Sequence, residues 1–217
     1  MMISPELYNQ AFIEGRPAKQ IRKEINLLKD RIRSLITIAE DPYTEDVSFS
    51  DKKETVIHNN IECLKSAIKS YVKAGGTYIP SKEVKAVIDF DESLNELSEL
   101  VYKSFGYLGW ENVTCAFSEK EVSIAREGLL RGQEEETFTV SKDEFISALK
   151  NLHLSTWKRC YEREFVFDGE EWKLKLIFSN GKTKKYSGYN HYPWNFEELR
   201  KLLGIREGEE YDESDQD

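Results

Sequence analysis

"EWKLKLIFSNGKTKKYSGY" (Glu171–Tyr189) gives the clearest local signal of how this chain folds. Charged and apolar side chains alternate from Glu171 to Leu176, which is the period of a half-buried β-strand. The Asn180-Gly181 pair that follows is typical of a tight hairpin turn, and a second strand-like run comes after it. We therefore predict a β-hairpin at this place, within an antiparallel sheet.

A two-residue turn at Asn180-Gly181 would fix which residues face each other across the hairpin. The pairs would be Phe178 with Thr183, Leu176 with Lys185, Leu174 with Ser187, and Trp172 with Tyr189. The core face would hold Trp172, Leu174, Leu176 and Phe178, and the opposite face Lys173, Lys175, Lys182, Lys184 and Tyr186. We expect these lysines to be solvated. The alternative is a basic patch for an acidic partner, with Lys173, Lys175 and Lys184 as candidate residues.

A loop, Gly188 to Trp194, joins the hairpin to a predicted helix that Asn195 would cap and Gly204 would follow. The N–H groups at a helix start can bind an anion. The candidate ligand-binding residues are therefore Tyr189, Asn190, His191, Tyr192 and Trp194. The alternative is a purely structural loop. In that case Gly188 supplies an unusual backbone angle, Asn190 bonds the turn, the aromatic side chains pack on the helix, and Pro193 fixes its entry.

Two apolar seams near the N-terminus predict a pair of helices. The first begins at Pro17 and the second runs from Asp51 to Gly75-Gly76, each with apolar residues at alternating steps of four and three. The seams hold Ile21, Ile25, Leu28, Ile32, Leu35 and Ala39, and Ile57, Ile61, Leu64, Ile68 and Tyr71. A short connection favours an antiparallel hairpin within one chain. The alternative is a homodimer that pairs these seams between two chains.

The first of these helices is basic. Arg22, Lys23 and Lys29 are its candidate partner-binding residues, because a basic helix can follow a phosphate backbone. No aromatic residues alternate with them, and the formal net charge of the chain is −9. We therefore expect a solvated helix face, and direct binding of nucleic acid is the least favoured function.

The remaining patterns predict the rest of an α+β fold. We expect a helix from about Asp91 that continues towards Tyr102 or gives way to a strand near it. We also expect a hairpin around Ser118–Lys120, a strand at "ETFTV", a helix after Ser141, and a short helix from Ser155 through Tyr161. A three-stranded antiparallel meander would run from "FVF" to Tyr189. The predicted organisation is a helical hairpin (1–76), an antiparallel sheet with packed helices (77–205) and an acidic disordered tail (206–217).

Composition and motifs exclude several classes of protein. No apolar run is long enough to span a membrane, and the N-terminus lacks the features of a signal peptide. The three cysteines are far apart, which fits a reducing cytoplasm and gives no zinc-site spacing. "GKT" lacks the first glycine of a phosphate-binding loop, and no hydrolase or metalloprotease motif is present. We expect no catalytic residues, no metal and no cofactor.

"FVFDGEEWKLKLIFSNGKTKKYSGYNHYPWNFEELRKLLGI", with the preceding "VSKDEFISALKNLHLSTWKRCY", resembles a module in an uncharacterised family of small phage and mobile-element proteins of Gram-positive bacteria. The family pattern falls on Asp168, Gly169, Trp172, Asn180, Gly181, Gly188, Asn190, Tyr192 and Pro193. "AGGTYIP" (Ala74–Pro80) and "SPELY" are also similar to it. The chain departs from the pattern at Glu170-Glu171, where the relatives often have Thr-Gln. The resemblance implies a fold unit and no reaction.

These observations favour a non-enzymatic cytoplasmic protein of phage or mobile-element origin that binds a host protein, in an anti-defence or host-modulating role. One alternative is a small-ligand or nucleotide-binding protein, or an enzyme, with its site in the 188–195 loop. The second alternative is nucleic-acid binding through the basic first helix.

Overall fold

The computed structural model describes residues 4–41, 43, 53–107, 109–128, 135–163 and 169–205. The chain folds into two compact units. A helical unit comprises Met1–Ala86 and His191–Trp194, and a sheet unit comprises Val87–Asn190 and Asn195–Asp217. The α+β class is confirmed. The segment proposed as an acidic tail, 206–217, lies outside the described residues.

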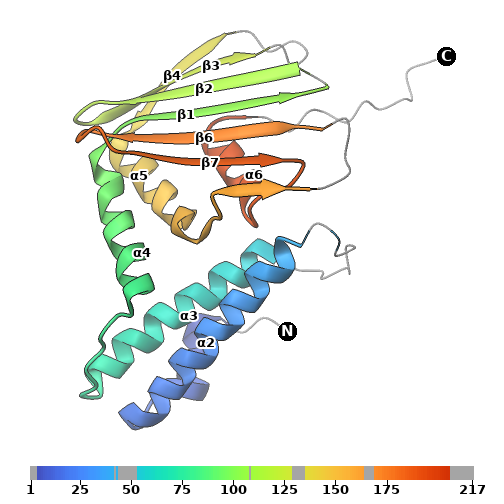
Figure 1. Ribbon diagram of the computed structural model, residues 1–217. Coiled ribbons are helices and arrows are strands. Elements are labelled where there is room, and N and C mark those ends of the chain that lie inside the picture. Colours follow the sequence, from blue (N-terminus) through green and yellow to red (C-terminus); the bar gives the residue numbers. More distant parts are fainter. Residues whose placement is uncertain are drawn as a thin grey trace, which may run out of the picture. The chain divides into compact units, whose positions relative to one another are not determined.

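The helical unit is built on two long antiparallel helices, α2 (Ala18–Ala39) and α3 (Lys53–Lys73) (Figure 1). They are preceded by α1 (Pro5–Tyr8) and by one π-helical turn, η1 (Asn9–Ile13). The predicted seams pack within one chain, so the antiparallel hairpin is confirmed. The predicted start of α3 at Asp51 lies outside the described residues.

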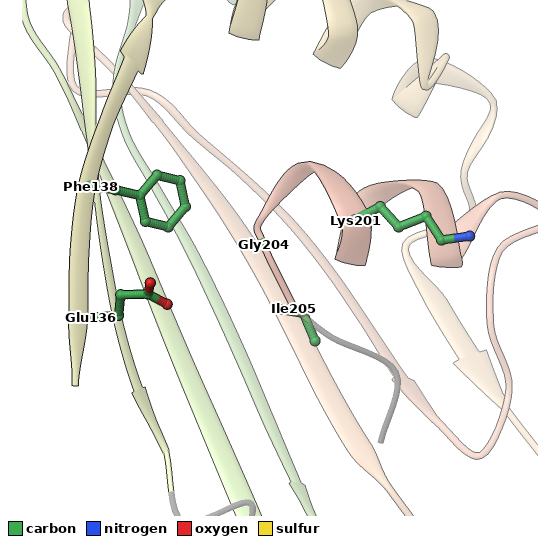
Figure 2. A pocket seen from close by; sticks show the side chains of 5 residues that line it. All are labelled: Glu136, Phe138, Lys201, Gly204 and Ile205. Carbon is green, nitrogen blue, oxygen red and sulfur yellow. The ribbon is translucent and has the colours of Figure 1, made fainter. Parts of the chain in front are cut away.

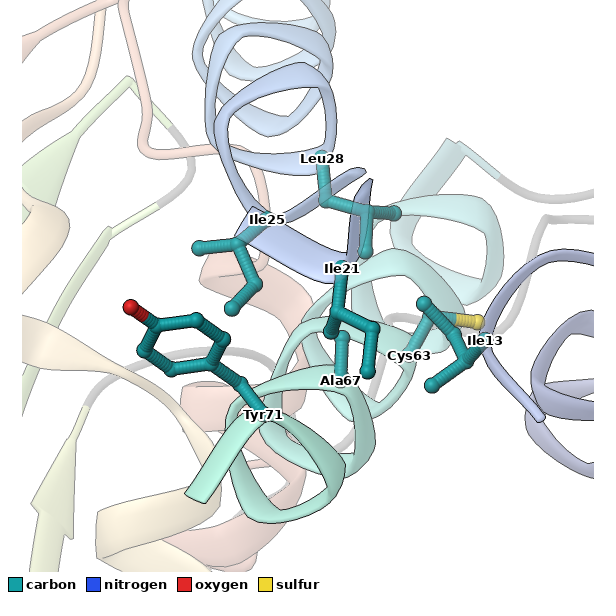
Figure 3. Close-up of a cluster of buried hydrophobic side chains, with 7 residues drawn as sticks. All are labelled: Ile13, Ile21, Ile25, Leu28, Cys63, Ala67 and Tyr71. Atoms are coloured by element: carbon teal, nitrogen blue, oxygen red, sulfur yellow. The ribbon is translucent and has the colours of Figure 1, made fainter. Parts of the chain in front are cut away.

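Two clusters of buried side chains hold this hairpin together. The first fills the space between α2, α3 and η1 and consists of Ile13, Ile21, Ile25, Leu28, Cys63, Ala67 and Tyr71 (Figure 3). The second lies further along the same helices and consists of Ile57, Ile61 and Trp194, with half-buried residues of α2 around it. Trp194 therefore completes the core of the helical unit from a position far along the chain.

The sheet unit contains seven strands in the order β4-β3-β2-β1-β6-β7-β5. Their bounds are β1 Leu97–Gly106, β2 Gly109–Phe117, β3 Glu121–Gly128, β4 Glu136–Ser141, β5 Cys160–Glu162, β6 Glu171–Phe178 and β7 Thr183–Tyr189. All neighbouring strands are antiparallel except β5 and β7, which are parallel. The strand predicted at "ETFTV" and the hairpin around Ser118–Lys120 are confirmed as β4 and as β2–β3.

Helices cover one face of this sheet, called here the inner face (Figure 1). They are α5 (Lys142–Asn151), a 3₁₀ turn η3 (Leu154–Thr156) and α6 (Phe196–Leu202). Helix α4 (Lys82–Ser93) crosses the boundary between the units and leads through a 3₁₀ turn, η2 (Leu94–Glu96), into β1. The core of the sheet unit lies on the inner face, where Tyr102, Trp172, Leu174 and Leu199 are buried.

The hairpin β6–β7 forms where it was predicted, but its register differs by one residue. The Phe178 N–H donates to the Lys182 carbonyl at 3.0 Å, and the Gly181 N–H donates to the Phe178 carbonyl at 2.9 Å. Gly181 has φ +78°, so the loop has three residues and ends in the left-handed conformation. Tyr186 therefore faces Leu174 and is buried, and Lys184 faces Leu176. The predicted two-residue turn was wrong, and so was the placement of Tyr186 and Lys184 on the outer face.

Two predicted helices were also wrong in extent. The helix expected from about Asp91 ends at Ser93, and the residues after Glu96 form β1, so the alternative of a strand near Tyr102 is confirmed. The helix expected from Ser155 is a single 3₁₀ turn, and Tyr161 lies in β5. The first strand of the predicted meander falls largely on 164–168, outside the described residues.

Candidate functional site

The candidate ligand residues of the 188–194 loop are divided between the two units. Tyr189 and Asn190 belong to the sheet unit, whereas His191, Tyr192 and Trp194 belong to the helical unit. Asn190 has φ +46°, and its Oδ1 accepts a hydrogen bond from the Glu170 N–H at 2.7 Å. This bond closes the loop locally, as the structural interpretation predicted. Gly188 does not have the positive φ that we expected of it.

The other end of the loop is bound to the helical unit. His191 Nε2 lies 2.6 Å from the backbone carbonyl of Glu40, so this nitrogen carries a hydrogen and donates it. The Trp194 side chain is only 5% exposed and packs on Ile57 and Ile61. The His58 ring lies edge-on to the Trp194 ring, and the two ring centres are 4.9 Å apart. These contacts give the loop a structural role.

Asn195 occupies the cap position of α6, but its side chain does not bind the helix start. It is fully buried; Oδ1 accepts from Trp157 Nε1 at 2.8 Å, and Nδ2 donates to the Leu152 carbonyl at 2.7 Å. The amide thus connects the end of α5, the segment before β5 and the start of α6. Helix α6, whose start was the expected anion site, has only seven residues.

The candidate partner-binding residues also fall into separate groups. Arg22 and Lys23 are exposed on α2, and Lys29 is half-buried with its Nζ 5.3 Å from the centre of the Tyr78 ring. Lys184 lies on the inner side of the sheet, where its Nζ is 3.6 Å from the centre of the Phe90 ring. Burial lowers the Lys184 pKa, and the charge of Arg159 lowers it further, while Asp91 acts in the opposite direction.

Lys173 and Lys175 share the outer face of the sheet with two lysines that the sequence did not single out. Lys103 lies directly opposite Lys173, and Lys175 lies directly opposite Lys185. We call these four residues, Lys103, Lys173, Lys175 and Lys185, the lysine face. Like charges directly across a sheet repel each other, so each pair disfavours the folded state. Glu171 offsets part of this repulsion through an ion pair with Lys173 at 2.6 Å.

The second feature of the sheet unit is the edge strand β4. The Lys142 N–H donates to the Lys120 carbonyl at 2.9 Å, and the register from there to Glu136 is continuous. Hydrogen-bonded residues alternate along an antiparallel strand, so the N–H and C=O groups of Thr137 and Thr139 point away from β3. Within the described part of the chain, no strand pairs with this side of β4.

A hollow opens beside β4 on the inner face (Figure 2). Its volume is about 440 Å³, and it is lined by Glu136, Phe138, Lys201, Gly204 and Ile205. Buried Arg126 fixes the surroundings of this hollow: Nη2 lies 2.5 Å from Glu136 Oε2, and Nη1 donates to the Gly204 carbonyl. Strand β4 and the end of α6 are thereby held on opposite sides of the hollow.

Glu111 is a buried acid on the inner face near Arg126. Its side chain is 2% exposed, and neither carboxylate oxygen has a hydrogen-bond partner among the described residues. Burial raises the Glu111 pKa, although the positive charges of Arg200 and Arg126 act in the opposite direction. Desolvation therefore outweighs the two arginines, and the charged form of Glu111 destabilises the folded state.

A scan against protein-family models found no match, and searches of curated proteins and of solved structures found none either. No helix in the described part of the chain is long and apolar enough to cross a membrane. Among the same residues, no group of three or more His, Cys, Asp or Glu side chains could hold a metal ion.

Proposed function

We propose that the protein is a non-enzymatic protein-binding protein, and that its partner adds an extended segment to β4. The observation that carries this proposal is the edge of the sheet at Thr137 and Thr139, with which no strand of the described residues pairs. An exposed edge strand presents unpaired backbone groups that another chain can use. Addition of a strand to such an edge is a common mode of peptide recognition.

The two edges of the sheet differ in how well they are protected. At one edge, β5 has three residues, and short edge strands discourage pairing with another chain. At the other edge, β4 has six residues, "ETFTVS", with no proline, no lysine and no irregularity in its pairing with β3. Its single charge, on Glu136, is paired with Arg126. Only β4 therefore lacks the usual protective features.

The backbone groups alone would give weak binding. Thr137 and Thr139 offer four outward groups, and the N–H of Ser141 adds a fifth. At about 1 kcal/mol for each hydrogen bond, this total is about 5 kcal/mol, which is near the lower end of the cost of association. Filling the hollow beside Phe138 with an apolar side chain would add about 1.5–3 kcal/mol. The proposed partner segment is thus β-forming and carries an apolar residue on its inner face.

The resemblance to phage and mobile-element proteins supports a cytoplasmic host protein as the partner. An edge strand suits such a role, because it recognises main-chain groups, which most substitutions in the host protein leave in place. The function would then be host modulation or anti-defence. In this proposal the chain carries out no reaction.

The test is partner capture with a pair of variants at one position. Thr139→Pro removes an outward N–H and blocks strand addition, whereas Thr139→Val keeps the backbone and the β-branched shape. A host protein should cross-link to β4 in the wild type and in Thr139→Val, and its binding to Thr139→Pro should be at least about tenfold weaker. Hydrogen exchange should show new protection at Thr137 and Thr139. Equal binding by both variants, with unchanged circular dichroism spectra, would contradict the proposal, and so would the capture of no partner.

A further inference from the structure

The lysine face combines charge repulsion with exposed aromatic rings. Two directly opposed lysine pairs lie next to each other on β1, β6 and β7, and neighbouring strands are separated by only about 4.8 Å. A surface of solvated lysines gains nothing from direct opposition. A bound polyanion would turn this repulsion into attraction, because each phosphate could lie between positive charges.

Aromatic side chains lie at one end of the same face. Phe105 is 65% exposed and lies opposite both Trp110 and Glu171, and Glu171 lies opposite Tyr189. Tyr107, in the turn after β1, is 92% exposed. Large exposed aromatic rings are costly to leave in water, and rings next to lysines can stack on nucleic-acid bases.

We propose that the outer face of the sheet binds single-stranded nucleic acid. The four residues of the lysine face contact phosphates, and Phe105 provides the principal stacking surface for a base. Trp110 and Tyr189, both half-buried, border that stacking surface.

A single strand fits this face better than a duplex. Stacking on an aromatic ring requires an unpaired base, and a sheet face without a helix cannot enter the groove of a duplex in the way that a recognition helix does. Within the described part of the sheet unit, all packed helices lie on the inner face, so the outer face carries none (Figure 1). Glu99, Glu121, Glu127 and Glu171 also lie on the outer face, so binding of a polyanion depends on the clustering of the four lysines on β1, β6 and β7 and not on the net charge of the face. An acidic protein segment would contact the lysines but would not need Phe105, which separates the two partners experimentally.

The binding assay is fluorescence anisotropy with the full-length protein. The probes are a labelled 12-nucleotide DNA strand, an RNA strand of the same length, the matching DNA duplex, and a polyglutamate peptide. If each of the four lysines neutralises one phosphate, the logarithm of the binding constant should fall with the logarithm of salt concentration at a slope of about −2.8. Affinity should then fall about 50-fold between 50 and 200 mM salt.

Two sheet variants and one matched control test the location. Changing Lys103, Lys173, Lys175 and Lys185 to Gln should reduce binding of the single strands to the detection limit at 50 mM salt. Phe105→Ala should weaken that binding about 5- to 150-fold and leave polyglutamate binding unchanged. The control changes Arg16, Lys19, Arg22 and Lys23 of the helical unit to Gln and alters net charge equally. This control should keep single-strand binding, with at most a modest loss of affinity.

Several outcomes would overturn the inference. Absence of single-strand binding at 50 mM salt by the wild type is one. Another is a greater loss of binding in the helical-unit control than in the four-lysine sheet variant, because that would locate the site on the basic helix. A third is polyglutamate binding as tight as single-strand binding with no effect of Phe105→Ala, which would indicate an acidic protein partner. Thr139→Pro should keep nucleic-acid binding, so failure of the β4 proposal and failure of this one are distinguishable.

Discussion

Replacing Asn195 with alanine should destabilise the sheet unit strongly. The change removes an acceptor from Trp157 Nε1 and a donor from the Leu152 carbonyl, and both of those groups are left in a fully buried site. Each unpaired buried polar group costs about 1–3 kcal/mol, so we expect a loss of about 2–6 kcal/mol. That is a large part of the 5–15 kcal/mol that typically stabilises a folded protein.

Asn195→Asp is a second variant at this position, with a side chain of nearly the same size and shape as asparagine. The carboxylate keeps an acceptor for Trp157, but its second oxygen would face the Leu152 carbonyl, and its charge would be buried. Burial raises the pKa of such an acid above its value in the unfolded chain. Stability of this variant should therefore fall as pH rises above about 4, and it should recover in acid, where the protonated oxygen can donate.

The measurement is hydrogen exchange in increasing urea, followed by mass spectrometry. Peptides from β6 report on the sheet unit, and peptides from α2 serve as an internal control. Trp157→Phe retains the packing against Trp172 and Tyr186 but removes the N–H. A double-mutant cycle of Trp157→Phe with Asn195→Ala should give a coupling of about 0.5–3 kcal/mol. An Asn195→Ala loss below about 0.5 kcal/mol, the size of an ordinary surface substitution, would refute the argument.

Three further predictions follow from other features. The unfolded chain loses the Glu111 proton near pH 4.5, whereas the folded chain keeps it to higher pH. The free energy of unfolding therefore falls as pH rises from about 4.5 through the folded-state pKa. Glu111→Gln should abolish this pH dependence in urea titrations between pH 4 and 8. Trp194→Ala should cost the helical unit about 3–5 kcal/mol, seen as faster amide exchange in α3, and unchanged exchange there would contradict its role in the core. Changing the seven acids of residues 207–217 to their amides in the full-length chain should tighten single-strand binding severalfold at 50 mM salt, because their repulsion is removed; the same affinity would indicate that these charges do not act on the lysine face.

The sequence predicted the elements that have strong local signals. The apolar seams of α2 and α3 and the turn residues around β2–β3 were sufficient for those parts. The start of β1 was assigned to a helix because the register shifts between Leu97 and Glu99, so that Leu97 and Leu100 both face the core. This spacing of three imitates a helix. Asn-Gly also suits a three-residue loop, so the turn residues alone could not give the register of β6–β7.

The candidate surfaces depended on long-range pairing. Lys103 and Lys173 are about seventy positions apart in the sequence, and only the pairing of β1 with β6 places them together. No local pattern contains that information. Asn195 illustrates the opposite case, since its position at a helix start predicted a cap. In the folded protein, its side chain forms hydrogen bonds with two buried groups from other segments and none with the start of the helix.

The discontinuity of the helical unit has a consequence for synthesis on the ribosome. This unit takes its last residues, His191–Trp194, from beyond the strands of the sheet unit. At about 5–20 residues per second, the roughly one hundred residues between Ala86 and His191 take about 5–20 s to translate. During that interval Ile57 and Ile61 lack the tryptophan that covers them, so the nascent helices expose an apolar patch that chaperones can bind. The helical unit can therefore be completed only after the strands of the sheet unit and Trp194 have been made.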